Sequence, residues 1–168
     1  MSLCPSAYVL LTLKSSVTKK IIKALVRIKM GYQKQLVLGN LDSKRDWGHA
    51  RDYVEAMWKI LQQKKPNDYV IATGKQHSIR QFINFVAKKL NMKIIWKGTG
   101  LNEVGYDVLN KKKIILVDKN YIRPLDVNTL LGNAAKARRE LKWKPQINIH
   151  TLIDEMITEE MNILSNDQ

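Results

Sequence analysis

The stretch KRDWGHARDYVEAMWKILQQ, Lys44–Gln63, joins a dense polar group to an amphipathic helical pattern. The polar group comprises Lys44, Arg45, Asp46, His49, Arg51 and Asp52. Apolar residues then recur at the i, i+3, i+4, i+7 spacing that aligns one face of a helix: Ala50, Tyr53, Val54, Met57 and Leu61. We therefore expect a helix that buries this face and gathers charge at its start. On spacing alone, a solvated helix start is the more frequent explanation of such charges.

Four separated stretches carry recognisable motifs: GNLDSKRDWGHARDYVEAMW, YVIATGKQHSIRQF, YIRPLDV and KARRELKWKP. In order and in spacing they resemble the GDP-mannose 4,6-dehydratases, a family of the extended short-chain dehydrogenase/reductase superfamily. The resemblance covers roughly Val17 to Leu164. It implies a chain that corresponds to the carboxyl-terminal, sugar-nucleotide-binding part of such an enzyme.

The composition is that of a folded protein with one domain. At 168 residues and 45% hydrophobic content, the chain can bury a real core and is not a disordered tail. A single cysteine, Cys4, excludes an internal disulfide and suits a reducing compartment. No apolar run is long enough to cross a bilayer, and the short AYVLLTL stretch lacks a basic leader. We expect a soluble cytoplasmic protein.

The charge balance favours a polyanionic or phosphorylated partner. Lys and Arg number 29 against 15 Asp and Glu, which gives a net charge of +14. That charge alone would suit RNA, DNA or a nucleotide-sugar diphosphate.

The first sixteen residues, MSLCPSAYVLLTLKSS, depart from the family pattern. The family normally carries a polar loop there, with a His and an Arg that reach NADP. We therefore expect an unmatched, poorly ordered leader over residues 1–16 and a sugar-nucleotide-binding domain over residues 17–168.

The order of predicted elements favours a helix-rich α/β lobe with a few short strands, without the doubly wound Rossmann sheet of the full-length family. Predicted strands are Gln35–Leu38, Asp68–Gly74, Lys93–Trp96 and Ile114–Val117, with a loop over Gly98–Lys113. Predicted helices are Thr18–Met30 before Gly31, one capped by Ser78 and Gln81, one from Val127 that breaks near Gly132, Ala134–Leu141, and one capped by Asn148.

Two arginines are the main candidates for binding a diphosphate. An arginine presents several donors in one plane, which suits phosphate oxygens better than the point charge of a lysine. In related enzymes the arginine of the RD(Y/W)xH pattern meets the pyrophosphate, which implies this role for Arg45, while Asp46 and His49 hold the turn. The family pattern RPxEV supplies an arginine to the phosphates and a glutamate to the ribose, which implies these roles for Arg123 and for Asp126, one methylene shorter. Either arginine alone is more often a surface ion-pair residue.

The resemblance also implies nucleotide contacts for Lys19 or Lys20, because the family's VTRKI stretch lies beside the nucleotide. The alternative is a basic amphipathic helix that simply packs and is solvated. The tryptophans Trp47, Trp58, Trp96 and Trp143 are more often core residues than base-stacking platforms. The three histidines lack cysteine or carboxylate partners at ligand spacing, so we expect no metal site.

The catalytic and cofactor-binding patterns of the family are missing. The family's reaction needs a glycine-rich phosphate loop for NADP and a Tyr-x-x-x-Lys pair. No lysine follows any tyrosine at the fourth place, and Gly98-Thr99-Gly100 is too short to be a dinucleotide fingerprint. We expect no catalytic residues here and no NADP held by this chain alone.

These patterns support one main hypothesis. The chain is the substrate-binding part of a GDP-mannose 4,6-dehydratase, which converts GDP-mannose to GDP-4-dehydro-6-deoxy-mannose on the way to GDP-L-fucose. It is inactive alone, and its exposed apolar surface leads to self-association or to pairing with a separate amino-terminal Rossmann half. The alternatives are a basic nucleic-acid-binding module and a remnant without function.

Overall fold

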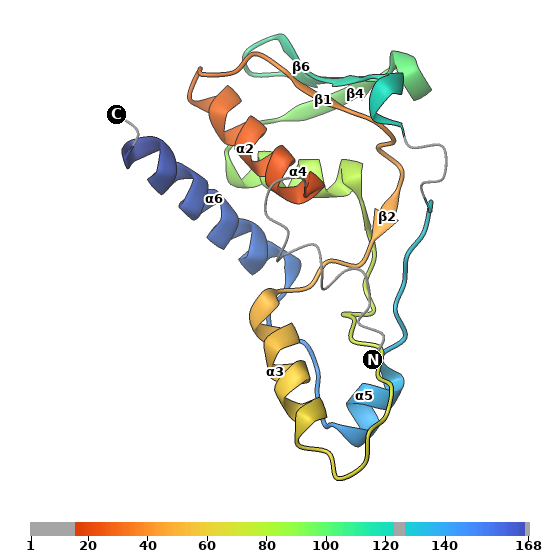
Figure 1. Ribbon diagram of the computed structural model, residues 1–168. Helices are drawn as coiled ribbons and strands as arrows, with labels where there is room; N and C mark the ends of the chain where they lie inside the picture. Colours follow the sequence, from red (N-terminus) through yellow and green to blue (C-terminus); the bar gives the residue numbers. More distant parts are fainter. Residues whose placement is uncertain (1–15, 123–126, 167–168) are drawn as a thin grey trace. The chain divides into compact units, whose positions relative to one another are not determined.

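The computed structural model describes residues 16–122 and 127–166, which form two compact units (Figure 1). Within these ranges, unit 1 comprises Ser16, Lys44–His77 and Thr129–Leu152, and unit 2 comprises Val17–Ser43, Ser78–Asn128 and residues from Ile153 onward. Each unit is thus assembled from stretches that are far apart in the sequence. The single domain that the sequence predicts over residues 17–168 stays a prediction, since the two units describe only how the chain packs. The predicted leader lies outside the described residues, apart from Ser16.

Unit 2 contains a four-stranded mixed sheet in the order β1-β6-β5-β4. The strands are β1 (Leu36–Leu38), β4 (Ile94–Lys97), β5 (Val104–Asp107) and β6 (Lys112–Val117). β1 runs parallel to β6, with Val37 opposite Leu116, whereas β5 pairs antiparallel with both β4 and β6. The strands predicted near residues 35–38, 93–96 and 114–117 are confirmed, and the chain is α/β. The structure assigns no strand over residues 68–74, which the sequence predicts as a strand.

The loop predicted over residues 98–113 is wrong for Val104–Asp107, which form the strand β5. Glycine and aspartate are poor strand formers, yet Gly105 and Asp107 are both buried in β5. The Asp107 carboxylate accepts hydrogen bonds from Leu109 N at 3.1 Å and from Asn110 Nδ2 at 2.5 Å. Pairing with two neighbouring strands therefore outweighs local propensity, and the buried carboxylate stabilises the hairpin that leads into β6.

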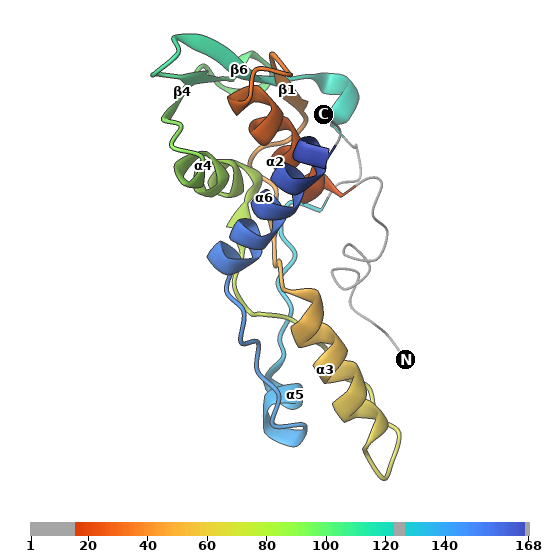
Figure 2. The ribbon, with the colours of Figure 1, turned by 90° about the vertical axis from the view of Figure 1, so that its left-hand side faces the viewer.

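Three helices lie on one face of this sheet: α2 (Val17–Lys29), α4 (Ile79–Lys89) and α6 (Ile149–Asn166), whose first turn belongs to unit 1 (Figures 1 and 2). Their apolar stripes form the core of unit 2, which includes Ile21, Leu25, Phe82, Ile83, Val86, Ile114, Ile115 and Ile153. Ion pairs join α6 to the other two helices: Lys89–Asp154 at 2.6 Å and Arg27–Glu160 at 3.6 Å.

The predicted ends of these helices are confirmed. Gly31 adopts a left-handed φ of +84° after α2, as a C-terminal stop requires. Ser78 and Gln81 form a complete capping box at the start of α4. Asn148 Oδ1 accepts hydrogen bonds from His150 N at 2.9 Å and Thr151 N at 3.1 Å, so Asn148 caps α6.

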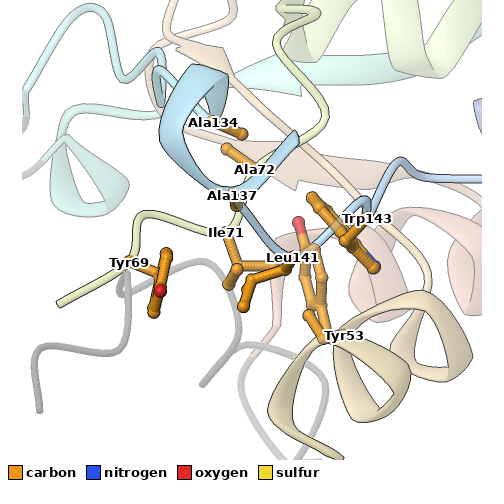
Figure 3. Packing of buried hydrophobic residues seen from close by; sticks show 9 residues of the cluster. Tyr53, Tyr69, Ile71, Ala72, Ala134, Ala137, Leu141 and Trp143 are labelled. Atoms are coloured by element: carbon orange, nitrogen blue, oxygen red, sulfur yellow. The ribbon is translucent and has the colours of Figure 1, made fainter. Parts of the chain in front are cut away.

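Unit 1 is built from β2 (Lys44–Arg45), α3 (Ala50–Leu61), α5 (Ala135–Glu140) and the extended stretches between them. A short sheet joins β2 to β3 (His77–Ser78) at the end of the unit. The core cluster of this unit (Figure 3) comprises Tyr53, Ala56, Tyr69, Ile71, Ala72, Ala134, Ala137, Leu141 and Trp143.

The helix predicted from Val127 is wrong, whereas the predicted helix near residues 134–141 is confirmed as α5. Thr129 instead forms a parallel bridge with Lys44, and Leu130 N donates to Lys44 O at 3.3 Å. These contacts hold the backbone extended, so tertiary pairing overrides the helical pattern.

The apolar stripe predicted for α3 is only partly correct. Tyr53 is buried, and Asp52 and Ala56 complete the buried face. By contrast, Val54 and Leu61 are 63% and 72% exposed. The helix carries apolar residues on two faces, and unit 1 covers only one of them.

Candidate functional site

The predicted substrate-binding residues fall in both units. Arg45 lies in unit 1, whereas Lys19 and Lys20 lie on α2 in unit 2. Arg123 and Asp126 lie outside the described residues. The predicted convergence of Arg45 and Arg123 on one diphosphate therefore stays a prediction.

Arg45 ends the short strand β2 and is half-buried. Its Nη1 donates a hydrogen bond to Lys44 O at 2.8 Å. The same carbonyl accepts from Leu130 N at 3.3 Å, so the backbone beside the guanidinium is tied to a distant stretch of unit 1. A fixed backbone and a partly exposed, planar guanidinium are compatible with the predicted contact to phosphate oxygens, which stays a prediction.

Asp46 holds the turn formed by Thr73 and Gly74. This contact agrees with the structural role predicted for Asp46. Its side chain is buried, and Oδ1 accepts hydrogen bonds from Thr73 N at 3.1 Å and from Thr73 Oγ1. Oδ2 accepts from Gly74 N at 2.8 Å. Both carboxylate oxygens are therefore engaged, and they fix the residue next to Arg45 in the chain.

His49 is the N-cap of α3. Its Nδ1 accepts a hydrogen bond from Arg51 N at 3.1 Å, and the side chain is buried. An accepting Nδ1 places the proton of the neutral ring on Nε2. This arrangement supports the structural role that the sequence favours for His49.

Sequence reasoning missed the role of Asp52, which it placed in the charged group. Asp52 is buried, and its Oδ2 accepts from Gln146 N at 3.1 Å and Ile147 N at 3.0 Å. Its backbone carbonyl accepts from Trp143 Nε1 at 2.8 Å. Asp52 thus ties α3 to a stretch more than ninety residues away, and only the folded chain reveals this link.

Lys20 lies over an aromatic ring in unit 2. Its Nζ is 3.8 Å from the centroid of the Tyr121 ring, which belongs to η2 (Lys119–Tyr121). Partial burial lowers the pKa of Lys20 from its ordinary value. This cation–π contact places a lysine next to the end of η2, close in sequence to Arg123.

The turn after β1 packs closely against the same helix end. A Cβ added to Gly39 would lie 2.2 Å from the backbone oxygen of Tyr121. Asn40 Nδ2 donates to Asn128 Oδ1 at 3.4 Å. The described residues on both sides of 123–126 are therefore in contact with residues 39–40.

Gly39→Ala is expected to lower the free energy of unfolding by roughly 1–3 kcal/mol, because the new methyl group overlaps a backbone atom that cannot rotate away. Chemical denaturation followed by circular dichroism measures this change. Gly31→Ala is the comparison, since its Cβ would meet no atom within 4 Å and only the positive φ is unfavourable. An equal or smaller loss for Gly39→Ala than for Gly31→Ala would contradict the close approach.

Arg80 on α4 is a second residue that sequence reasoning missed. Its guanidinium pairs with Asp42 at 2.7 Å and with the buried Glu103, and it lies 5.0 Å from the centroid of the Trp96 ring. The surrounding sequence pattern identifies only the cap of α4. Arg80 links three separate stretches of unit 2 and is therefore a structural arginine.

The tryptophans divide between core and surface. Trp143 is fully buried, as predicted, whereas Trp58 is 61% exposed on α3. No helix within residues 16–122 and 127–166 is long and apolar enough to cross a membrane.

A comparison with solved structures identifies the fold. The chain aligns with the structure of RMD from Pseudomonas aeruginosa, which was solved in complex with NADPH, with a TM-score of 0.68 and 19% sequence identity. The alignment covers 88% of this chain and 43% of that protein. The described residues therefore share the fold of part of that protein.

Comparisons of the amino-acid sequence identify the family to which this chain belongs. The family model for GDP-mannose 4,6 dehydratase matches residues 8–156. GDP-mannose 4,6 dehydratase 2 of Caenorhabditis elegans is 44% identical over 90% of this chain, and the GDP-mannose 4,6-dehydratase of Sinorhizobium fredii is 45% identical over 88%. This chain belongs to the GDP-mannose 4,6-dehydratase family. It spans 39% and 42% of the lengths of these two relatives. The family match begins at residue 8, before the onset at Val17 that the motifs indicate.

Proposed function

We propose that this chain is the carboxyl-terminal, substrate-binding part of a GDP-mannose 4,6-dehydratase and that it binds the GDP moiety of GDP-mannose. The observation that carries the proposal is the family match over residues 8–156 in a chain that spans only about 40% of its relatives. The complete reaction would yield GDP-4-dehydro-6-deoxy-mannose, the first step towards GDP-L-fucose. The chain alone is inactive because it lacks a Tyr-x-x-x-Lys pair. The family match does not favour a nucleic-acid-binding module.

In this proposal Arg45 binds the diphosphate as a planar donor, and Asp46 keeps its backbone in place. Arg123 is the second phosphate-binding arginine, and Asp126 accepts hydrogen bonds from the ribose hydroxyl groups. Lys20 adds positive charge beside η2, and Lys19 is its half-buried neighbour on α2.

The glycine-rich stretch of this chain does not fit NADP. A dinucleotide needs backbone amides at the junction of a strand and an α-helix. Gly98 instead connects β4 to the three-residue η1 (Gly100–Asn102), and a Cβ at Gly98 would meet Asn102 O at 2.3 Å. We infer that NADP and the Rossmann sheet belong to the part of the enzyme that this chain does not span.

Arg45→Ala is expected to weaken GDP binding roughly 10- to 100-fold, because a charge-assisted hydrogen bond contributes about 1.5–3 kcal/mol. Arg45→Lys should recover part of the affinity, since it restores the charge without the planar fork. Isothermal titration calorimetry with GDP and GDP-mannose measures both effects.

Arg139→Ala is the matched control, since the Arg139 side chain lies in unit 1 and is 71% exposed. It should leave GDP affinity unchanged. A random oligonucleotide provides a further comparison: saturable GDP binding with weak oligonucleotide binding supports the proposal. Binding of the oligonucleotide alone, with a steep loss of affinity in salt, would support the nucleic-acid alternative.

A further inference from the structure

The sheet of unit 2 has two different faces. The helices α2, α4 and α6 all lie on the same face (Figures 1 and 2). On that face, Trp96 Nε1 donates to Asn84 Oδ1 of α4 at 3.1 Å, and a Cβ added to Gly105 would lie 3.2 Å from the Trp96 ring. Successive side chains of a strand point to opposite faces, so the neighbours of these residues point away from the helices. We call this second surface the open face, and it comprises Val37, Ile95, Lys97, Val104, Tyr106, Lys113 and Leu116.

The pairing register aligns the open face in two rows that cross the sheet, because directly opposite residues on paired strands share a face. The first row is Ile95, Tyr106 and Lys113, and the second row is Lys97, Val104, Leu116 and Val37. Ile95 is 40% exposed, and the other apolar members are half-buried. Four strands at a spacing of about 4.8 Å make a surface roughly 14 Å wide. The open face is therefore a flat, largely apolar surface in contact with solvent.

Two lysines gather around Tyr106 on the open face. The Nζ atom of Lys97 lies 5.1 Å from the centroid of the Tyr106 ring, and the Nζ atom of Lys113 lies 5.9 Å from it. The electron-rich face of an aromatic ring attracts an ammonium group at such distances. Tyr106 therefore holds two positive charges beside the apolar rows.

The strands β4 to β6 and their turns carry a surplus of positive charge. Residues 93–119 contain six exposed lysines: Lys93, Lys97, Lys111, Lys112, Lys113 and Lys119. The three carboxylates of this stretch all have partners within the chain. Glu103 pairs with Arg80, Asp107 accepts from two groups of its own turn, and Asp118 Oδ1 accepts from Asn120 N at 2.8 Å. An apolar centre with lysines around it is complementary to a partner that is apolar in its centre and acidic at its rim.

We infer that the open face binds an amphipathic helix of a partner protein, with acidic residues on both sides of the helix's apolar stripe. The apolar rows contact the stripe, and Lys97 and Lys113 pair with the acidic residues. This inference goes beyond the proposed function, because no residue of the open face belongs to the proposed GDP site.

The chemistry of the open face favours this occupant over three others. A helix of about 10–12 Å diameter fits the width of the sheet and satisfies its own backbone hydrogen bonds. An extended peptide on a sheet face would leave its N–H and C=O groups unpaired. Single-stranded nucleic acid stacks its successive bases on several aromatic rings, whereas the open face carries Tyr106 as its one aromatic residue. A second copy of this chain, with a net charge of +14, lacks the complementary charge.

NMR titration of the isotope-labelled chain with a model peptide tests the inference. The probe is a 14-residue peptide held helical by a side-chain cross-link, with leucines along one stripe and glutamates on both sides of it. We expect saturable shift changes in the amides of β4, β5 and β6. A matched peptide with lysines in place of the glutamates should bind at least about 10-fold more weakly, because like charges then face each other.

Two pairs of variants test the residues of the open face. Replacing both Lys97 and Lys113 by glutamate should weaken binding of the glutamate peptide at least about 10-fold, since two attractions become repulsions. Replacing Lys64 and Lys65 by glutamate changes the net charge equally at exposed positions of unit 1, and affinity should stay nearly unchanged. Ile95→Gln should weaken binding several-fold by removing an apolar contact. Val70→Gln is its control, since Val70 is 44% exposed in unit 1. Circular dichroism checks that each variant folds.

Several outcomes would overturn the inference. The absence of saturable shift changes, equal affinity for the two peptides, or equal losses in a variant and its control would each do so. Tighter binding of a twelve-nucleotide oligo(dT) at the same strands would assign the open face to nucleic acid. Shift changes at these strands with rising concentration of the chain alone, together with dimers in sedimentation experiments, would assign it to a second copy. Calorimetry with GDP on the variant with glutamate at 97 and 113 separates this inference from the proposed function, since GDP affinity should persist when peptide binding is lost.

Discussion

Trp143→Ala is expected to lower the free energy of unfolding by about 3–5 kcal/mol, the range measured when a large buried aromatic residue is truncated. Trp143 is fully buried in the core cluster of unit 1 (Figure 3) and donates a hydrogen bond from Nε1 to Asp52 O at 2.8 Å. The substitution removes both the packing and this link to α3. Such a loss is comparable to much of the total stability of a small domain. Urea denaturation followed by circular dichroism measures it.

Trp143→Phe separates the two contributions. Phenylalanine keeps an aromatic ring in the cluster but cannot donate to Asp52 O, so we expect a loss of roughly 1–2 kcal/mol. Amide exchange in the sheet of unit 2 serves as an internal reference, because Trp143 belongs to the other unit. A change of less than about 1 kcal/mol for Trp143→Ala would contradict its place at the centre of the core.

Local sequence signals predict those elements that depend on local interactions. Gly31 after α2 and the Ser78–Gln81 capping box both concern atoms within one or two helical turns, and both are confirmed. β5 depends instead on β4 and β6, so the poor strand propensities of Gly105 and Asp107 lead to a wrong prediction. The periodic spacing of apolar residues predicts that α3 is amphipathic. It cannot tell which of the two apolar faces the rest of unit 1 covers.

The candidate site also contains some features that the sequence predicts and others that only the folded chain shows. The charged group before α3 is visible in the sequence, and resemblance singles out Arg45 within it. The structure then separates roles that spacing cannot separate: Asp46 fixes a turn, His49 caps a helix, and Asp52 joins a distant stretch. Each of these roles depends on a backbone N–H that the sequence does not place. Arg80 is missed for a related reason: its carboxylate partners, Asp42 and Glu103, come close to it only in the folded chain.

Asp46→Asn is expected to destabilise the chain by about 2–3 kcal/mol, because both oxygens of the buried Asp46 carboxylate accept hydrogen bonds. Oδ1 accepts from Thr73 N and Thr73 Oγ1, and Oδ2 accepts from Gly74 N at 2.8 Å. An amide keeps only one accepting oxygen. Its NH₂ group would face either the backbone of Thr73 or that of Gly74, so one donor would be left buried and unpaired.

Asp52→Asn is the matched control for this effect. Asp52 is also buried, but among the residues that the structure describes a single oxygen, Oδ2, accepts from both Gln146 N and Ile147 N, at 3.1 and 3.0 Å. An asparagine can place its single carbonyl oxygen at that position and keep both contacts. We expect a loss of about 1 kcal/mol, from the weaker hydrogen bonds of a neutral acceptor.

The difference between the two variants is the decisive measurement, because both remove one negative charge from a buried position in unit 1. If the free energies of unfolding from urea denaturation fall equally, the loss of charge controls stability and the count of accepting oxygens does not. If Asp46→Asn is clearly the more destabilising, the geometry of the Thr73–Gly74 turn controls stability. That result would also predict faster amide exchange at either Thr73 or Gly74 in Asp46→Asn alone, since one of these two donors would lose its acceptor there and both keep it in Asp52→Asn.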